Sequence, residues 1–314
     1  MATVCECTET IGNIALPKCS TEIGIITRVI YQPIFKGDGT LNSIDTTATL
    51  NAAYFDALQY NLDKNLRIYP LNKDLEEVQL PKDDVKYQEF SSGRKIKVRN
   101  GVRNFEAMLP IAPNQLIGKL NNVGCGKMGV YFLTNTGQLV GFKRKGFDTL
   151  FFPIPLADDT LNGDYMFATD NEREMTKLQM QFDSSVLDEN FSVLSSDEIP
   201  DLRTQLNGML DVNIAKVGTG TTTSVKVAIT LDYGTAKTKT PVKGLVLADF
   251  TMYNTTTSLA VTPSAVVEAV DGSGYTFTFP TQTLTNVLRF GLAANANTKP
   301  FDASRWVTQQ VITL

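Results

Sequence analysis

The chain has 314 residues, of which 42% are hydrophobic and 20% charged, and this is the composition of a globular protein with one large or two ordinary domains. The net charge of −4 favours neither nucleic acid nor an anionic membrane as a partner of the whole surface. The absence of histidine excludes catalytic triads built on that residue. No apolar run approaches the ~20 residues that cross a bilayer, and the first residues do not resemble a signal peptide, so we expect no membrane insertion and assembly in a cytoplasm.

Charge is unevenly distributed along the chain. Residues 206–314 hold 14 of the 62 charged residues, and Pro200 and Gly208 lie where the composition changes. We therefore expect two domains, 1–205 and 206–314.

The first part of the chain predicts mixed elements. Residues 23–35 predict a strand in which Pro33 indicates an edge or a bulge. Residues 46–66 predict a helix of about four turns, because apolar residues recur every fourth position after an N-cap at Thr46 or Thr47.

The elements that follow are mostly strands. Residues 113–120 predict one short helix, and 128–144 predict a hairpin that turns at Asn135–Gly137. In 176–183, apolar residues alternate as in a strand with one buried face. The first domain is thus predicted to be mainly β, a barrel or sandwich with one main helix.

Residues 94–110, RKIKVRNGVRNFEAMLP, form the most basic short stretch of the chain and predict a hairpin. Asn100–Gly101 between alternating apolar residues is the strongest short hairpin signal. On its first strand, Lys95, Lys97 and Arg99 would share one face and Ile96 and Val98 the other.

This basic face allows several partners. A basic strand can contact phosphates, but proteins that bind nucleic acid usually interleave aromatic residues, and only Phe90 and Phe105 lie near. The preceding residues 73–90 are acidic, so one copy could present them to the basic hairpin of the next, in head-to-tail contacts that build rings or tubes. A solvated face without a partner is the third interpretation. The candidate subunit-interface residues are Arg94, Lys95, Lys97, Arg99, Arg103, Asp74, Glu76, Glu77, Asp83 and Asp84.

Other candidate sites are weaker. Cys5, Cys7, Cys19 and Cys125 could bind zinc, although structural zinc sites usually pair two C-x-x-C knuckles and this spacing offers one tight pair. Small buried thiols are the alternative. The remaining carboxylates, including Asp188, lack the spacing of a cation site and predict solvated loops. We therefore expect no catalytic residue and no cofactor.

The second half alternates with a period of two. In 224–231, four aliphatic residues face one side, and in 275–279 Tyr275, Phe277 and Phe279 do the same. Further strands are expected in 211–217, 244–253, 264–270, 286–293 and 306–314. About seven short strands separated by turns predict an antiparallel sandwich.

Residues 242–280, with Asp271-Gly272-Ser273-Gly274-Tyr275 leading into an alternating strand, resemble the immunoglobulin-like modules of tailed-bacteriophage virion proteins. The layout of the chain resembles that of the tail tube proteins of tailed phages. This resemblance depends on this module and on the segments YQEFSSGRKIKVRNGVRNFEAML and CGKMGVYFLTNTGQLVGF. In that family's usual order the helix follows several strands, whereas here it is expected early.

The resemblance implies a structural protein of the virion that is not an enzyme. Copies of the first domain would assemble into stacked rings around a channel that passes DNA, in contact with other virion proteins. The second domain would decorate the exterior and contact host-surface glycans weakly. A capsid decoration or neck-ring protein is the alternative within the virion, and a nucleic-acid-binding or zinc-binding protein is the alternative of another class.

Overall fold

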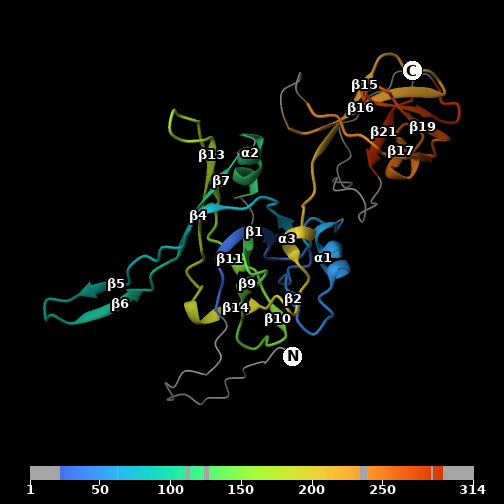
Figure 1. Cartoon of the computed structure of the whole chain (residues 1–314). Coiled ribbons are helices and arrows are strands. Elements are labelled where there is room, and N and C mark those ends of the chain that lie inside the picture. Colours follow the sequence, from blue (N-terminus) through green and yellow to red (C-terminus); the bar gives the residue numbers. More distant parts are fainter. Residues whose placement is uncertain are drawn as a thin grey trace. The chain divides into compact units, whose positions relative to one another are not determined.

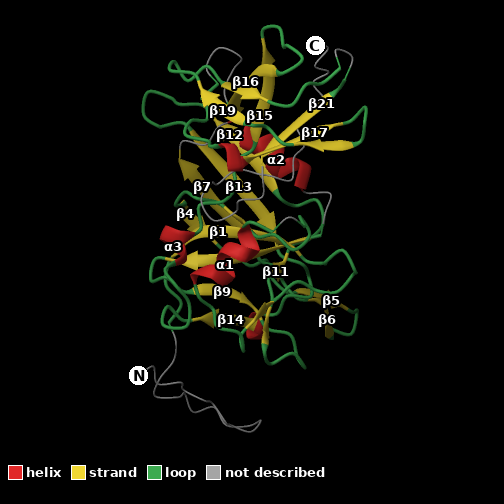
Figure 2. Ribbon diagram, turned by 90° about the vertical axis from the view of Figure 1, so that its right-hand side faces the viewer, coloured by secondary structure: helices red, strands yellow, loops and turns green. Residues whose placement is uncertain are grey.

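The computed structural model describes residues 22–61, 63–110, 114–123, 127–233, 239–283 and 286–292, and in these ranges the fold is mainly β (Figures 1 and 2). Contacts divide the chain into two compact units, with residues up to Phe55 and Ile68–Asn207 in the first, and Asp56–Arg67 and the residues from Gly208 in the second. The sequence did not indicate that Asp56–Arg67 would join the second unit.

The first unit contains two larger sheets. One has the order β14-β9-β8-β1-β3, with β11 paired to β8, and the other has the order β12-β13-β7-β4. The strands of the first are β1 (Ile26–Pro33), β3 (Tyr69–Pro70), β8 (Met128–Thr134), β9 (Leu139–Phe142), β11 (Ile154–Pro155) and β14 (Phe191–Leu194). Those of the second are β4 (Glu76–Gln79), β7 (Asn104–Pro110), β12 (Asn162–Met166) and β13 (Met175–Gln181). Two shorter pairs join β2 (Ile44–Asp45) to β10 (Leu150–Phe151), and β5 (Lys86–Glu89) to β6 (Lys95–Arg99).

The two larger sheets share one apolar core. On β7 and β13, alternate residues are buried, and they pack with buried residues of β1, β8 and β9. Phe105 of β7 stacks on Phe132 of β8 with ring centroids 5.0 Å apart, and Phe182 lies 6.0 Å from Phe132. These rings hold the sheets together face to face.

The β8–β9 hairpin and the alternation along β13 confirm two sequence predictions. Gly137 has a φ of 80° in the turn after β8, which a residue without a Cβ adopts readily. All residues of β8 are buried, because its other face is covered by the β2–β10 pair, where Phe151 stacks on Tyr131.

The helices differ from the prediction. Helix α1 (Ala52–Gln59) is much shorter than the predicted 46–66. It begins after Asn51, whose side chain accepts from the Tyr54 amide at 3.0 Å, so the N-cap is Asn51 rather than Thr46 or Thr47. Side chains of Asp45 and Asp63 bond to backbone amides two residues on, which favours turns over helix at both ends.

The first unit is mainly β as predicted, and it contains more than the one main helix expected. The short helix expected near 113–120 is α2 (Asn114–Val123), which is longer than α1, and it packs on β12, where the Gly163 amide donates to Asn121 Oδ1. A single turn, α3 (Leu202–Gln205), lies near the end of the first unit, and η1 (Asp188–Asn190) precedes β14.

The second unit is a β-sandwich. One sheet has the order β15-β16-β20-β19 and the other β18-β17-β21. Taken in chain order, the first has the A-B-E-D arrangement of immunoglobulin-like domains, which agrees with the prediction. The strands are β15 (Val212–Val217), β16 (Ser224–Leu231), β17 (Phe250–Asn254), β18 (Leu259–Val261), β19 (Ala265–Glu268), β20 (Tyr275–Thr278) and β21 (Leu288–Leu292), with η2 (Leu247–Asp249) before β17.

The core of this sandwich centres on Phe277. Its ring contacts Phe250 at 4.8 Å and Phe290 at 5.2 Å, so residues of both sheets meet on one side chain. Residues Tyr275, Phe277 and Phe279 are all buried, as the alternation predicted. The strand expected in 306–314 lies outside the described residues.

Candidate functional site

The basic residues lie on a two-stranded arm that extends β4 and β7 away from the body of the first unit (Figure 1). Near the body, Gln79 lies opposite Glu106 in the strand pair. Further along, the backbones of Lys82 and Arg103 form an isolated antiparallel β-bridge. The Asp83 amide then donates to the Val102 carbonyl at 2.9 Å, before β5 pairs with β6. The arm is therefore the outer part of one antiparallel ribbon rooted in the β12-β13-β7-β4 sheet.

The predicted hairpin of 94–110 was wrong in its pairing. Strand β6 pairs with β5, which precedes it, whereas β7 pairs with β13 and β4. The turn lies at Phe90–Arg94, where the Phe90 amide donates to the Arg94 carbonyl and Gly93 has a φ of 77°. Residues Asn100–Gly101 lie midway along one strand of the ribbon.

A close approach of two backbones, rather than a turn, requires glycine at position 101. A Cβ at Gly101 would lie 1.7 Å from the carbonyl oxygen of Asp83 on the facing strand. The two backbones therefore approach more closely than any side chain allows. This is why an Asn-Gly pair stands where the chain does not reverse.

A β-bulge divides the basic residues between the two faces of the arm. Opposed residues in an antiparallel pair share a face, so Lys95 lies with Glu89 and Lys97 with Tyr87. A register shift between Lys86 and Tyr87 pairs Lys86 with Arg99. Because Lys86 and Tyr87 point to opposite faces, Arg99 does not share the face of Lys95 and Lys97, contrary to the prediction.

The arm exposes apolar side chains along its length. Every residue of β5 and β6 is exposed, and Tyr87, Ile96 and Val98 are 59%, 43% and 63% exposed. Phe90 at the turn is 42% exposed. A two-stranded ribbon without a second layer is marginally stable in water, so these side chains would be stabilised by packing against another surface.

Charge on the arm is largely uncompensated. The Nζ of Lys95 lies 3.3 Å from Glu89 Oε2, and both side chains are about 60% exposed, so the pair contributes ~0–1 kcal/mol. Arg94, Lys97 and Arg99 form no ion pair with another described residue.

Arg103 lies at the root of the arm and is held by its own chain. Its Nε donates to Asp188 Oδ1 at 2.7 Å, and Lys82 Nζ donates to Asp188 Oδ2 at 2.6 Å. The hydrogen bonds from Arg103 and Lys82 lower the pKa of Asp188 from 3.8 to about 2. Asp188 was predicted to be a solvated loop residue, but it joins the two strands of the ribbon root through one carboxylate.

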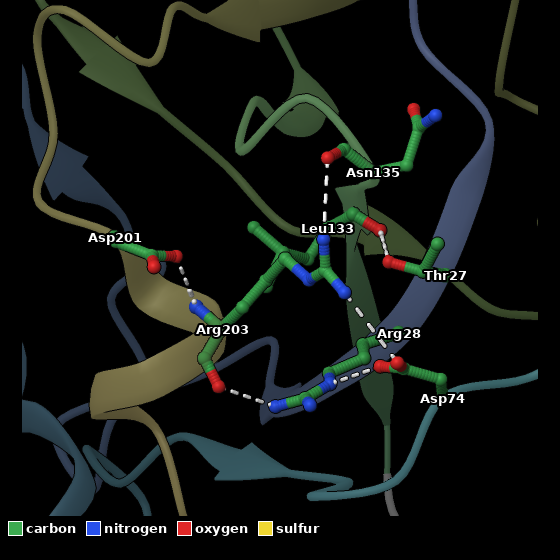
Figure 3. A network of polar contacts seen from close by, with 7 residues as sticks. All are labelled: Thr27, Arg28, Asp74, Leu133, Asn135, Asp201 and Arg203. Atoms are coloured by element: carbon green, nitrogen blue, oxygen red, sulfur yellow. Dashed lines mark hydrogen bonds and ion pairs between the residues drawn. The ribbon is translucent and has the colours of Figure 1, made fainter.

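Asp74 belongs to a second polar network (Figure 3). Arg28 Nε donates to its Oδ1 at 2.6 Å, and Arg203 Nη2 lies 3.5 Å from its Oδ2. Arg28 also donates to the Arg203 carbonyl at 2.6 Å, and Arg203 donates to the Asn135 carbonyl at 3.3 Å. Two arginines of its own chain thus hold Asp74 and fasten α3 to β1 within the first unit.

The other acidic candidates lie on the same ribbon as the basic ones. Glu76 and Glu77 are exposed on β4, and Asp83 and Asp84 are exposed between β4 and β5. The Asn104 amide group donates to Asp83 Oδ1 at 3.1 Å. The ribbon is therefore acidic near its root and basic towards its end.

Sequence reasoning missed Tyr87 as part of the site. Its exposure follows from the pairing of β5 with β6, which places it opposite Lys97. The apolar alternation of 85–89 with 96–98 is the signal that could have found it, but the Asn-Gly pair pointed to another partner strand.

The four cysteines, Cys5, Cys7, Cys19 and Cys125, lie outside the described residues, so the zinc hypothesis stays a prediction. Within the described ranges, no group of three or more acidic or cysteine side chains is arranged to hold a metal ion. Helices in the described part of the chain are too short or too polar to cross a membrane.

Comparisons with known proteins give no relative: no protein-family model, curated protein or solved structure matches this chain.

We expect Gly101→Ala to destabilise the root of the arm, because the new Cβ would clash with the Asp83 carbonyl. Overpacking of this kind costs about 1–3 kcal/mol. Hydrogen exchange of residues 80–104 should become faster. Gly118→Ala is the control, since Gly118 is exposed on α2 with no atom within 4 Å of its Cβ, and it should gain up to ~1 kcal/mol. Equal exchange in both variants would contradict the close approach.

We expect Asp188→Asn to lower the free energy of unfolding only where the carboxylate is charged. Because folding lowers this pKa from 3.8 to about 2, the stabilisation is complete above the unfolded pKa and is lost as the pH falls through that interval. The side chains are 29% to 44% exposed, so the effect at neutral pH should be below about 1 kcal/mol. Urea unfolding of wild type and variant between pH 6 and pH 2 measures the difference. Asp158→Asn, an exposed carboxylate, is the control, and a pH-independent loss would refute the assignment.

Proposed function

We propose that this chain is a structural virion protein, the tail tube protein of a tailed phage, which assembles with copies of itself into stacked rings that form a DNA-conducting channel. The observation that carries the proposal is the β5–β6 arm. It stands away from the body of the first unit and exposes apolar and basic side chains together (Figure 1).

The arm has the properties of an element that packs on another chain. Among the described strands, β5 and β6 pair only with each other, so each has one open edge with unpaired backbone groups. Open edges accept an added strand, and the exposed Tyr87, Ile96 and Val98 would then be buried. The lysines along β6 disfavour indiscriminate edge pairing, which makes a specific partner the better interpretation.

The rest of the chain supports the same function. The first unit has a large core of its own, which provides a rigid base for the arm. The second unit also has its own core, so it can serve as a separate exterior module that contacts other virion proteins or host glycans. Function would come from contacts between subunits rather than from catalysis, in a particle assembled in the host cytoplasm.

Binding of nucleic acid by the arm is the second candidate. Tyr87 lies opposite Lys97 and Phe90 beside the basic turn, so exposed aromatic rings do accompany the positive charges. Ile96 and Val98 argue against it, because aliphatic side chains do not stack on bases.

Purified protein should form rings or tubes in electron microscopy and sediment as large species. A capsid decoration or neck-ring protein would instead form single rings or bind a preformed shell. Monomers alone, over a wide range of protein and salt concentration, would contradict self-assembly.

Reversal of Lys95, Lys97 and Arg99 to Glu should reduce the assembled fraction, because like charges would then meet the partner surface. Its matched control is reversal of Lys143, Lys145 and Lys243, which are exposed outside the arm. Sedimentation and electron microscopy measure assembly, and retention on DNA is measured in parallel. Unchanged assembly with lost DNA retention would favour the nucleic-acid candidate.

A further inference from the structure

The sheet that carries the arm has a second projection at its opposite end. Along the β7–β13 pair, Asn104 opposes Gln181 and Pro110 opposes Met175. The arm continues from the Asn104 end, whereas the β12–β13 hairpin turns beyond Met175 and Met166 at the other end. Figure 1 shows the two projections leaving the first unit in different directions.

The end of the β12–β13 hairpin, residues 164–174, is acidic and exposed, and we call it the β12–β13 tip. It contains four acidic residues and one basic residue, a net charge of −3. Asp164, Asp170 and Glu172 are exposed. The matching segment of the arm, 86–99, contains five basic residues and one acidic residue, a net charge of +4.

The β12–β13 tip also presents apolar surface. Phe167 is 77% and Met166 37% exposed. The ring of Phe167 packs edge-on against Tyr165 at 4.9 Å, and Glu174 across the hairpin raises the pKa of Tyr165. Aromatic rings held in place beside carboxylates suit a partner that offers apolar and basic side chains together.

We infer that the arm of one copy docks on the β12–β13 tip of a second copy. The charges are opposite and nearly equal, and each surface exposes apolar side chains that the other could cover. This inference rests on the proposed self-assembly and names its two contact surfaces.

The contact must be between copies rather than within one. The arm and the β12–β13 tip leave opposite ends of β7, which has seven residues, so ~20 Å of strand separates their points of departure. The two surfaces also differ from each other. When such a contact repeats head to tail from copy to copy, it builds rings or stacks.

The β12–β13 tip is a better acceptor than the acidic residues predicted from the sequence. Asp74 is held by Arg28 and Arg203, and Asp83 lies on the ribbon that carries the basic residues. Asp170 and Glu172 form no ion pair with another described residue.

A charge exchange between two variants tests the inference. Lys95→Glu with Lys97→Glu reverses two charges of the arm, and Asp170→Lys with Glu172→Lys reverses two charges of the β12–β13 tip. Each variant alone should raise the concentration needed for assembly at least ~10-fold, because like charges would face each other. A mixture of the two should recover assembly, since each reversed surface then meets a complementary one on the other variant.

Controls separate this contact from a general effect of charge. Lys143→Glu with Lys145→Glu, and Asp148→Lys with Asp158→Lys, change the net charge equally at other exposed positions. These variants should assemble like wild type, and circular dichroism confirms that every variant folds. Wild-type assembly should weaken at ionic strengths near 1 M, where the Debye length is about 3 Å.

Cross-linking locates the contact directly. Ser92→Cys at the end of the arm and Ala168→Cys on the β12–β13 tip lie at exposed positions. A thiol cross-linker should join the two variants when they are mixed, above the background of the native cysteines in wild type.

Different results would contradict self-assembly and the choice of the β12–β13 tip as the acceptor. A wild-type protein that never assembles would refute self-assembly itself. Wild type that assembles, with an impaired arm variant but an unaffected tip variant, or a mixture that is not restored, would overturn the β12–β13 tip as the acceptor. Loss of DNA retention with intact assembly would assign the arm to nucleic acid.

Discussion

The stacking of two sheets through Phe105, Phe132 and Phe182 is the contact on which the first unit depends. Phe105 and Phe182 are fully buried, and Phe105 lies next to the first residue of β7. The strand is thus fixed in the core at one end, while the ribbon to which it belongs continues into solvent. A rigid core and a projecting arm are consecutive parts of the same strand pair, which gives the arm a defined direction.

Ion pairs hold this transition from core to solvent. Asp188 accepts from Arg103 and Lys82, one on each strand of the ribbon, just where the core ends. Beyond that point the basic side chains have few partners among the described residues of their own chain. Partly exposed pairs contribute little free energy each, but they orient the strands that they join. Basic residues at the root of the arm are paired within the chain, whereas those further along the arm are exposed and available to a partner.

The two units have different roles in this view. The second unit buries Phe277 between its two sheets, and its described strands have the order of an immunoglobulin-like sandwich. The first unit instead exposes apolar side chains on a ribbon that lacks a second layer. Self-assembly would bury these apolar side chains against another copy. A β12–β13 tip of opposite charge on a neighbouring copy would make the contact directional.

The sequence by itself determined the elements whose side chains alternate between core and solvent. Strands β13, β16 and β20 were predictable because burial on one face imposes a period of two. The turn at Asn135–Gly137 was predictable because it contains Gly137, which adopts the positive φ that the turn needs. Only the tertiary structure decided which strand pairs with β6, because the Asn-Gly pair signals a turn locally but serves here a close approach to Asp83. The tertiary structure also decided the face of Arg99 and the partners of Asp74 and Asp188, because a bulge and contacts between residues distant in the chain leave no local pattern.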